Sequence, residues 1–507
     1  MSRLLGMYEQ YDRFEMPEYH GGEKKMLSCD LAVVGGGGSG LSAAVRAAEL
    51  GAKPIIIEKT DRLGGNSFLA GGLLSTTSKY QKDLGFEDRT DHYLETALKF
   101  NRYLLDPRLY SRYIRNSGRY LEWLVEHGLD IDNSRWVMDG SVLLLKEPVM
   151  ESPLHNPAYG PGWTGTAVVN ILEEQVRKLK IPVLLETKAE GLMTDSSGVV
   201  TGVLAEGQDA SYEIHAKAVL ISAGNCAGNE KLLRRLLPKY FTSDNWFSHY
   251  SLSCMTGDGI LIAEEAGAET GKNMSVSIHP LGHYPGTYTV QRLISEPIGI
   301  VVNREGKRFC CEDDADNAEL VMDRQPEGLG YYILDSRTLE EGFSLVLDHI
   351  RFGDRVPTHE EFEQNLKDEI EQGKVARAES LEELSRFIGC DPAGLQATVD
   401  RCNGHYRRGK DDEFYKDPEN LRELKTPPFY AVRLQRNFDV TMGGISIDYR
   451  FRALRPDQTV IPGLYATGDN ASNWMGEEYG PMFSSFCWAV NSGFLLGEQI
   501  AQEFGDR

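Results

Sequence analysis

The chain has 507 residues, of which 41% are hydrophobic and 26% are charged, and its formal net charge is −22 at pH 7. This length leaves room for two or more domains, one of which can be discontinuous. So negative a charge argues against binding to nucleic acid or to anionic membrane surfaces, and against attraction of dicarboxylates by the overall field.

Residues 1–27 are interpreted as an N-terminal extension, because they contain neither the apolar core nor the small-residue cleavage site of a secretory signal. No run of 18 apolar residues follows, so no membrane-spanning helix is predicted. The eight cysteines form no C-x-x-C pair, and the adjacent Cys310 and Cys311 are interpreted as packed thiols rather than as a redox pair. This pattern favours a reducing compartment, and we expect a cytoplasmic protein.

The stretch from Leu31 to Lys59 has the pattern of a strand, a glycine turn, a helix and a second strand. The apolar residues 31–34 predict the first strand, an Ala-rich helix begins near Ser39, and residues 54–57 predict a strand that ends at Glu58. An acidic residue at this distance from the turn accepts the ribose hydroxyls of an adenosine in dinucleotide-binding folds. The complete pattern therefore predicts a dinucleotide site rather than a plain glycine-rich turn. The glycines of its G-x-G-x-x-G motif are Gly35, Gly37 and Gly40.

Two segments that follow directly resemble the GGN-S/T-x-x-AGG stretch of a flavoprotein superfamily. They read GGNS at residues 64–67 and AGG at residues 70–72. The superfamily is that of the fumarate reductases and 3-ketosteroid dehydrogenases, and the resemblance runs from Asp30 to the C-terminus. It implies FAD as the cofactor. The FAD is expected to be non-covalent, because residues 64–72 contain no histidine, the residue through which succinate dehydrogenase flavoproteins attach it.

The sequence that follows predicts helical regions first and then several strands. Periodicity predicts helices within 91–128 and over 163–179, and strands at 181–187, 199–204, 212–214 and 218–222. In ketosteroid dehydrogenases a tyrosine from the first of these helical regions lines the substrate pocket. The spacing of the tyrosines here is more typical of packing residues, and the sequence does not decide which one would line a pocket. The four candidates are Tyr103, Tyr110, Tyr113 and Tyr120.

Three further segments resemble cofactor-binding motifs of the superfamily. An apolar strand enters Ala223-Gly224, residues 256–259 read TGDG, and residues 461–469 resemble the IPGLYAxGE/D strand. A helix from about Ser485 would direct its N-terminus at the flavin N1–C2=O edge and stabilise charge on reduced flavin. No metal site is predicted. The residues assigned to FAD are Gly35, Gly37, Gly38, Ser39, Gly40, Glu58, Lys59, Gly64, Gly65, Asn66, Ser67, Ala70, Gly71, Gly72, Ala189, Ala223, Gly224, Thr256, Asp258, Gly468, Asp469, Ser484 and Ser485.

From about residue 279 the pattern resembles the mobile capping domain of the superfamily. Residues 300–309 predict a β-hairpin around a Glu-Gly turn, and an acidic helical stretch follows to about Asn403. We therefore expect an α/β protein with a Rossmann-like FAD-binding domain of the glutathione-reductase type, which is discontinuous and carries an inserted α+β capping domain. The expected ranges are 28–278 and 440–507 for the FAD-binding domain and 279–439 for the cap.

The cations with which fumarate reductases hold a dicarboxylate are mostly replaced. Of the histidines and arginines that the resemblance asks for, only His279 fits, and Glu296 matches the glutamate of the family's proton path. Where that family has its acid arginine, a histidine before TMGG and a C-terminal arginine, this chain has Asp316, Asp439 and Tyr479. Two carboxylates and a phenol would repel or ignore a dianion. Fumarate is therefore not the expected substrate.

Residues 475–481, MGEEYGP, instead resemble the MG-x-x-Y-P-G segment of the ketosteroid dehydrogenases. The resemblance implies that the hydroxyl of Tyr479 and the backbone N–H of Phe483 hold a substrate ketone and stabilise the developing enolate. Asp316 stands where those enzymes have a second catalytic tyrosine. It is either a buried general acid or base, or one residue of an acidic surface loop. His279 is either a substrate contact or an ordinary histidine at a domain junction.

These residues predict an FAD-dependent oxidoreductase that acts on CH–CH groups. Hydride would pass between flavin N5 and a carbon of a C=C bond next to a carbonyl, in an apolar, polycyclic substrate such as a steroid enone or a flavonoid. The apolar pocket for it would include Met482, Phe483, Phe486 and Trp488. The alternatives are a reductase or reductive-elimination enzyme of isoflavonoid-type phenols, and a non-catalytic flavin electron-transfer subunit. No haem motif or second G-x-G-x-x-G occurs, so an external electron donor or acceptor is expected.

Overall fold

The structure is a computed structural model that describes residues 22–137, 139–145, 164–241, 246–248, 253–278, 293, 296–313, 321–322, 324–349, 358–477 and 484–505. The chain forms two compact units. The larger unit comprises Tyr8–Leu236, Tyr250–Ser277 and Val440–Arg507, and the smaller unit comprises Met1–Met7, Leu237–His249 and Ile278–Asp439.

The main sheet of the larger unit has the order β16-β17-β9-β1-β2-β6, and β8 and β7 extend it from β9. Its outer strands are β16 (Arg452–Leu454), β17 (Val460–Ala466), β6 (Val183–Leu184), β8 (Val200–Gly207) and β7 (Thr187–Thr194). β1 (Glu23–Val34) runs parallel to β2 (Pro54–Ile57) and to β9 (Ala210–Ile221). The apolar ends of these strands are buried, as expected for parallel strands covered on both faces. β1 begins eight residues before Leu31, inside the stretch interpreted as an extension, because its first residues pair with the start of β9.

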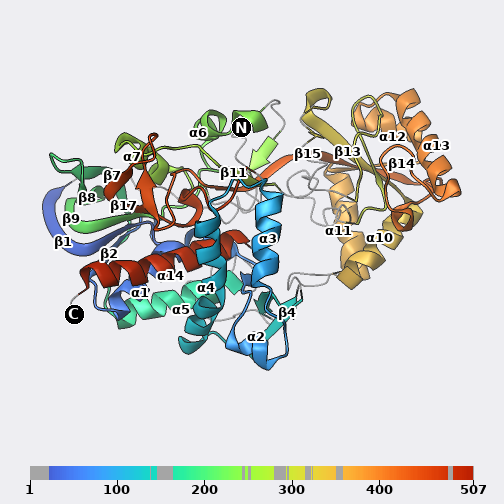
Figure 1. Cartoon of the computed structure of the whole chain (residues 1–507). Coiled ribbons are helices and arrows are strands. Elements are labelled where there is room, and N and C mark those ends of the chain that lie inside the picture. Colours follow the sequence, from blue (N-terminus) through green and yellow to red (C-terminus); the bar gives the residue numbers. More distant parts are fainter. Residues whose placement is uncertain are drawn as a thin grey trace. The chain divides into compact units, whose positions relative to one another are not determined.

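Helices α1 (Gly38–Glu49) and α14 (Ser484–Phe504) lie side by side, as Figure 1 shows in blue and red. Glycines permit this close approach. A Cβ atom at Gly493 would lie 2.0 Å from the carbonyl oxygen of Ser39, and one at Gly497 would lie 2.6 Å from that of Ala43. The packing holds the C-terminal helix against the helix that follows the glycine turn.

The helical region expected at residues 91–128 is two helices, α3 (Thr90–Phe100) and α4 (Pro107–Glu126). The break has a local cause. Pro107 restricts the residue before it, and the carboxylate of Asp106 caps α4 by accepting a hydrogen bond from the backbone N–H of Arg108 at 2.9 Å.

The other elements of the larger unit follow in chain order. They are η1 (Gly65–Leu69), β3 (Leu73–Leu74), α2 (Lys79–Asp83), β4 (Ser134–Val137), β5 (Val142–Leu145), α5 (Thr164–Lys178), β6 (Val183–Leu184), β7 (Thr187–Thr194), β8 (Val200–Gly207), α6 (Glu230–Leu236), α7 (Asp258–Glu265), β11 (Ser275–Ile278, which ends at the unit boundary), β16 (Arg452–Leu454), β17 (Val460–Ala466) and η6 (Gly468–Asn470). The strands β3, β5 and β4 form a separate three-stranded sheet.

The smaller unit is a mixed sheet covered by helices on both faces. β13 (Leu329–Asp335) pairs antiparallel with β12 (Ile300–Val302) and with β15 (Phe429–Met442), and β14 (Val375–Ala378) also pairs with β15. Alternate residues of β13 face opposite sides. Tyr332 therefore joins the core under α10 (Ser336–His349) and α11 (His359–Glu371), and Tyr331 joins the core under α12 (Leu381–Ile388) and α13 (Pro392–Arg408). Figure 1 shows these helix pairs on either side of the sheet.

The remaining elements of the smaller unit are η3 (Pro238–Tyr240), β10 (Trp246–Ser248), η4 (Pro326–Gly328), α10 (Ser336–His349), α11 (His359–Glu371), α12 (Leu381–Ile388), α13 (Pro392–Arg408) and η5 (Pro418–Asn420). Among the described residues, no helix is both long and apolar enough to cross a membrane. The cytoplasmic location stays a prediction. All eight cysteines are free thiols, of which Cys29 and Cys311 are half-buried and the others buried.

The hairpin expected at residues 300–309 forms only in part. β12 ends at Val302 and takes β13 as its partner, whereas an isolated bridge joins Val302 to Arg308. In the second arm, the guanidinium of Arg308 forms buried ion pairs with Glu312 and Asp411.

Candidate functional site

The turn between β1 and α1 depends on three glycines for two different reasons. Gly35 has a φ of +103°, and a Cβ atom on Gly40 would lie 2.0 Å from the carbonyl oxygen of Gly35. These two positions therefore exclude a side chain for the sake of the fold. At Gly37 a Cβ atom would have only the Gly64 carbonyl oxygen within 4 Å, at 3.8 Å. Gly37 keeps space open beside the turn.

That space is a cavity of about 1150 Å³, including its open mouth. The N-terminus of α1 borders it and carries no acidic residue in its first turn, so its N–H groups and dipole favour a phosphate. The residues assigned to FAD from the sequence that line the cavity are Gly35, Gly37, Gly38, Ser39, Glu58, Lys59, Gly65, Asn66, Ser67, Ala189, Ala223, Gly224, Asp258, Gly468 and Asp469.

The carboxylate of Glu58 is fixed at the end of β2 by the loops around it. Its Oε2 accepts a hydrogen bond from the N–H of Gly36 at 2.8 Å, and its Oε1 accepts bonds from the N–H and the hydroxyl of Thr60, both at 2.9 Å. Because these bonds hold the carboxylate at the cavity wall, it has the location and chemistry of a ribose acceptor.

Lys59, Thr256 and Asp258 meet at the start of α7. The ammonium of Lys59 donates to Asp258 Oδ2 at 2.6 Å and to Thr256 Oγ1 at 2.8 Å. Burial alone would raise the pKa of Asp258, but the charge of Lys59 and these hydrogen bonds outweigh it and hold the pKa below its ordinary value. Lys59 and Asp258 thus form an ion pair at the cavity wall, although the motifs that contain them lie far apart in the sequence.

Asp469 differs from the other acids of this site. Its Oδ1 accepts a hydrogen bond from the hydroxyl of Ser485 at 3.2 Å, and burial raises its pKa to about 6. A carboxyl group at a cavity wall accepts hydrogen bonds from the hydroxyls of a polyol chain when it is ionised, and can also donate one when it is protonated. This chemistry fits the ribityl chain that the sequence motif predicts there.

Seven residues assigned to FAD whose side chains the structure describes do not line the cavity. Two of them make contacts next to it: Gly64 bridges to Gly37, and the carbonyl oxygen of Ala70 accepts a hydrogen bond from the N–H of Gly165 at 2.8 Å. The seven are Gly40, Gly64, Ala70, Gly71, Gly72, Thr256 and Ser485. The side chain of Ser484 lies outside the described residues.

Sequence reasoning missed other lining residues. Thr187 and Lys188 directly precede Ala189, and Cys254 and Met255 directly precede the TGDG segment, so extending each motif by two residues would have found them. Nothing in the sequence marked Arg62, Leu63, Phe68, Leu69 or Ala489.

Most of the catalytic candidates lie outside the described residues. These are His279, Asp316 and Tyr479, together with the N–H of Phe483. The structure describes the backbone of Asp439 as part of β15 but not its side chain. Glu296 is described and buried, and its carbonyl oxygen accepts a hydrogen bond from the hydroxyl of Tyr332 at 2.7 Å.

The aromatic residues that the sequence suggested as pocket residues differ in their burial. Trp488 is fully buried, stacks on Trp474 with ring centroids 4.7 Å apart, and donates its indole N–H to the carbonyl oxygen of Gly468. It packs in the core instead of lining an apolar pocket. Of the four tyrosines of the 103–120 region, three are buried and only Tyr103 is exposed, at 68%.

The comparisons with known proteins agree with this geometry. Residues 30–480 match the family described as FAD binding domain. The fumarate reductase (cytochrome) of Shewanella frigidimarina is 30% identical over 483 residues, which cover 93% of this chain and 77% of that protein. The vinyl phenol reductase of Lactiplantibacillus plantarum is 24% identical over 509 residues, which cover 94% of this chain and 97% of that protein.

A solved structure shares the fold. It is the 3-ketosteroid delta1-dehydrogenase from Sterolibacterium denitrificans in complex with 1,4-androstadiene-3,17-dione, with a TM-score of 0.75 and 21% identity, covering 94% of this chain and 100% of that one. The parallel sheet, the glycine turn and the cavity define a flavoprotein of the dinucleotide-binding class.

The chain belongs to the FAD binding domain family. It binds FAD and is an FAD-dependent oxidoreductase that acts on CH–CH groups. The superfamily, the fold class and the cofactor that the sequence motifs predicted are thereby confirmed.

Proposed function

We propose that the protein reduces a C=C bond conjugated to a carbonyl or a phenol in a neutral, apolar substrate. The observation that carries this proposal is the set of residues at the positions where fumarate reductases bind their dianion. Asp316, Asp439 and Tyr479 stand there, and none of them carries a positive charge. A neutral oxygen function suits such residues better than a second carboxylate does.

The relatives support a substrate of this kind. The vinyl phenol reductase matches this chain over nearly the full length of both proteins, and a 3-oxosteroid 1-dehydrogenase of Mycolicibacterium smegmatis is 26% identical, covering 93% of this chain and 97% of that protein. Both names describe a compound with an oxygen-bearing ring, a vinyl phenol in one and a 3-oxosteroid in the other. The polycyclic enone is therefore our first candidate substrate, and the phenolic alkene is the second.

The chain would contribute binding and proton transfer. When bound, reduced FAD supplies a hydride from N5. In this proposal the hydroxyl of Tyr479 and the N–H of Phe483 hold the substrate oxygen, and His279 contacts the substrate. Asp316 gives a proton to the carbon next to the one that receives the hydride, and the buried Glu296 returns a proton to Asp316. One hydride and one proton convert C=C into CH–CH, and an external donor restores the two electrons.

Tyr103 is the tyrosine of its region that we propose as a substrate contact. Its ring is exposed and its φ is +61°, an unusual value for a residue other than glycine. The side chain of Asn101, two residues earlier, accepts a hydrogen bond from the N–H of Gly476 at 2.7 Å. The turn that carries Tyr103 is thus fixed against the MG segment that leads to Tyr479.

The FAD is proposed to be held without a covalent bond, because no histidine occurs in residues 64–72. Acid precipitation of the holoprotein should therefore release all of the flavin into the supernatant. Yellow colour retained in the washed pellet would contradict this part of the proposal.

The experiment that tests the function is reoxidation of the photoreduced enzyme without oxygen. The panel contains a 3-keto-4-ene steroid, 4-vinylphenol, an isoflavonoid, fumarate and buffer alone, and flavin absorbance is followed. Fast reoxidation by the steroid or a phenol supports the proposal and names the class, and release of a leaving group from the isoflavonoid identifies reductive elimination. Fast reoxidation by fumarate overturns the proposal. Reoxidation by none of them favours a flavin subunit that passes electrons to a partner.

With the compound that reacts, two variants test the assigned roles. Tyr479→Phe and Asp316→Asn should each lower turnover at least about tenfold without loss of FAD, because each removes one hydrogen bond or proton from the transition state. Unchanged rates would remove these residues from the mechanism.

A further inference from the structure

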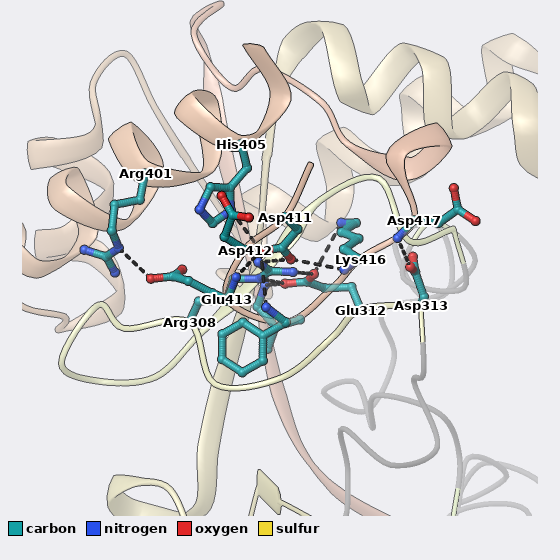
Figure 2. Close-up of polar contacts among 12 residues, drawn as sticks. Arg308, Glu312, Asp313, Arg401, His405, Asp411, Asp412, Glu413, Lys416 and Asp417 are labelled. Carbon is teal, nitrogen blue, oxygen red and sulfur yellow. Dashed lines mark hydrogen bonds and ion pairs between the residues drawn. The ribbon is translucent and has the colours of Figure 1, made fainter. Parts of the chain in front are cut away.

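The smaller unit contains a buried ion cluster to which nothing above assigns a role. Five side chains contribute to it, none of them more than 6% exposed. Figure 2 shows them converging from the segment after β12 and from the end of α13 with the loop that follows it. They are Arg308, Glu312, His405, Asp411 and Lys416.

Glu312 lies on one side of Arg308. The guanidinium of Arg308 binds both of its carboxylate oxygens, at 2.9 and 2.7 Å, and the N–H of Val301 donates to Oε1 at 2.9 Å. The ammonium of Lys416 is 3.3 Å from Oε2. Burial alone would raise the pKa of Glu312, but the charges of Lys416 and Arg308 outweigh it and lower the pKa.

Asp411 lies on the other side of Arg308. The guanidinium donates to its Oδ2 at 2.6 Å, the N–H of Glu413 donates to its Oδ1 at 2.9 Å, and Nδ1 of His405 is 2.9 Å from the same oxygen. Burial opposes ionisation, but the backbone N–H groups and Arg308 lower the pKa of Asp411 to about 2. Both acids are thus ionised at neutral pH and balance the charges of Arg308 and Lys416.

Lys416 connects this cluster to the segment that contains Glu296. Its ammonium donates to the carbonyl oxygen of Gly299 at 2.7 Å. The N–H of Gly299 donates to the hydroxyl of Tyr332 at 2.8 Å, and that hydroxyl donates to the carbonyl oxygen of Glu296 at 2.7 Å. A Cβ atom on Gly299 would lie 2.5 Å from Cζ of Tyr332, so only glycine permits this approach.

We propose that Tyr332 and Lys416 are positioning residues that fix the backbone of Glu296, so that the buried ion cluster determines where this proton-carrying carboxylate stands. The proposal rests on the proposed function, in which Glu296 returns a proton to Asp316. Proton transfer needs its partners within hydrogen-bond reach, and a small displacement lowers the rate steeply. A clamp on both ends of the turn at residues 296–299 prevents such a displacement.

Tyr332→Phe is the most direct test, because it removes the clamping hydroxyl and leaves the ring and the ion cluster in place. Tyr331→Phe is the matched control: it is the next residue of β13, is equally buried, and packs on the opposite face of the sheet. With the compound found by flavin reoxidation, we expect Tyr332→Phe to lower kcat about tenfold with KM and FAD content unchanged. Tyr331→Phe should keep the wild-type kcat.

Hydrogen exchange adds a readout that needs no substrate. Amides of the peptide that covers residues 296–302 should exchange faster in Tyr332→Phe than in Tyr331→Phe and the wild type, since the N–H of Gly299 loses its acceptor. Equal exchange in all three proteins would show that the hydroxyl does not fix this turn and would overturn the proposal.

A double-mutant cycle with Glu296→Gln tests the positioning role of Tyr332 separately from the proton-carrying role of Glu296. If Tyr332 acts through Glu296, the double variant should turn over within about twofold of Glu296→Gln alone. If the two losses multiply, Tyr332 acts elsewhere and the positioning proposal fails while the role of Glu296 stands. If Glu296→Gln alone keeps full turnover, the proton-carrying role itself fails, and with it the positioning proposal.

Lys416→Arg tests the second anchor without removing the charge beside Glu312. The guanidinium has a different reach, so we expect about a threefold loss of kcat that disappears in the Glu296→Gln background. Wild-type turnover of Lys416→Arg together with unchanged exchange at Gly299 would exclude Lys416 as an anchor.

Discussion

The two units use polar groups in opposite ways. In the larger unit, backbone N–H groups, glycines and the carboxyl groups of Glu58, Asp258 and Asp469 surround a cavity that a cofactor fills. In the smaller unit, Arg308 with its acidic partners forms a cluster whose charges neutralise one another within the protein. The difference teaches that polar groups next to a cavity mark a ligand site when a bound cofactor supplies their partners. Buried charges that other side chains neutralise instead have a structural role.

The largest effect expected from this contrast is at Glu312. Glu312→Gln leaves the charge of Arg308 and Lys416 only partly compensated in a buried site, so the unfolding free energy of the smaller unit should fall by about 3–5 kcal/mol in urea titrations. Arg401→Met breaks the half-exposed pair with Glu413 in the same region and should cost less than about 1 kcal/mol. Comparable losses in both variants would mean that the buried cluster stabilises the smaller unit no more than an exposed ion pair does.

The glycines of the larger unit allow a sharper distinction. Gly40→Ala places a Cβ atom against the carbonyl oxygen of Gly35 and should destabilise the larger unit by about 3 kcal/mol. Gly37→Val meets open space, so the protein should fold normally and lose FAD affinity at least about tenfold. Thermal unfolding of the apoprotein and flavin titration measure the two effects. Equal stability losses at both positions would contradict the division between fold and cavity.

A smaller effect is expected at Asp469, and it depends on pH. Its folded-state pKa of about 6 lies above the ordinary value of 3.8, so the folded state binds the proton more tightly and loses stability as the pH rises through about 6. In the apoprotein, Asp469→Asn should therefore be more stable than the wild type by about 2 kcal/mol at pH 7.5. The difference should shrink as the pH falls towards 4. A difference that grows on acidification would show the opposite shift.

The sequence predicted the larger unit well because its motifs are local. The strand, the glycines, the helix and Glu58 lie within 30 residues, and each has a backbone reason that a pattern can capture. The cluster around Arg308 could not be predicted in this way. It joins residues about 100 positions apart, and in the sequence Glu312 and Asp411 look like members of ordinary solvated acidic runs.

The partly formed hairpin shows the same limit. Periodicity correctly marked residues 300–302 as a strand, but the pattern could not show that β13 would be its partner. The hydrogen bond from Arg308, in the second arm, to Asp411 is a contact that only the folded chain contains. Trp488 gives a related example, because its stacking on Trp474 in the core is also a contact that the sequence pattern does not show.

The distribution of thiols gives each unit its own reporter of local opening. Cys226, Cys254 and Cys487 are buried in the larger unit, and Cys310, Cys390 and Cys402 are buried in the smaller one. Burial raises the pKa of Cys226 and of Cys390 to about 11, so such thiols react with alkylating agents only when the surrounding structure transiently opens. The rate at which each cysteine-containing peptide is alkylated would thus measure how often the surrounding structure opens. One sample would give this rate for the larger and the smaller unit separately, through cysteines that the chain already contains.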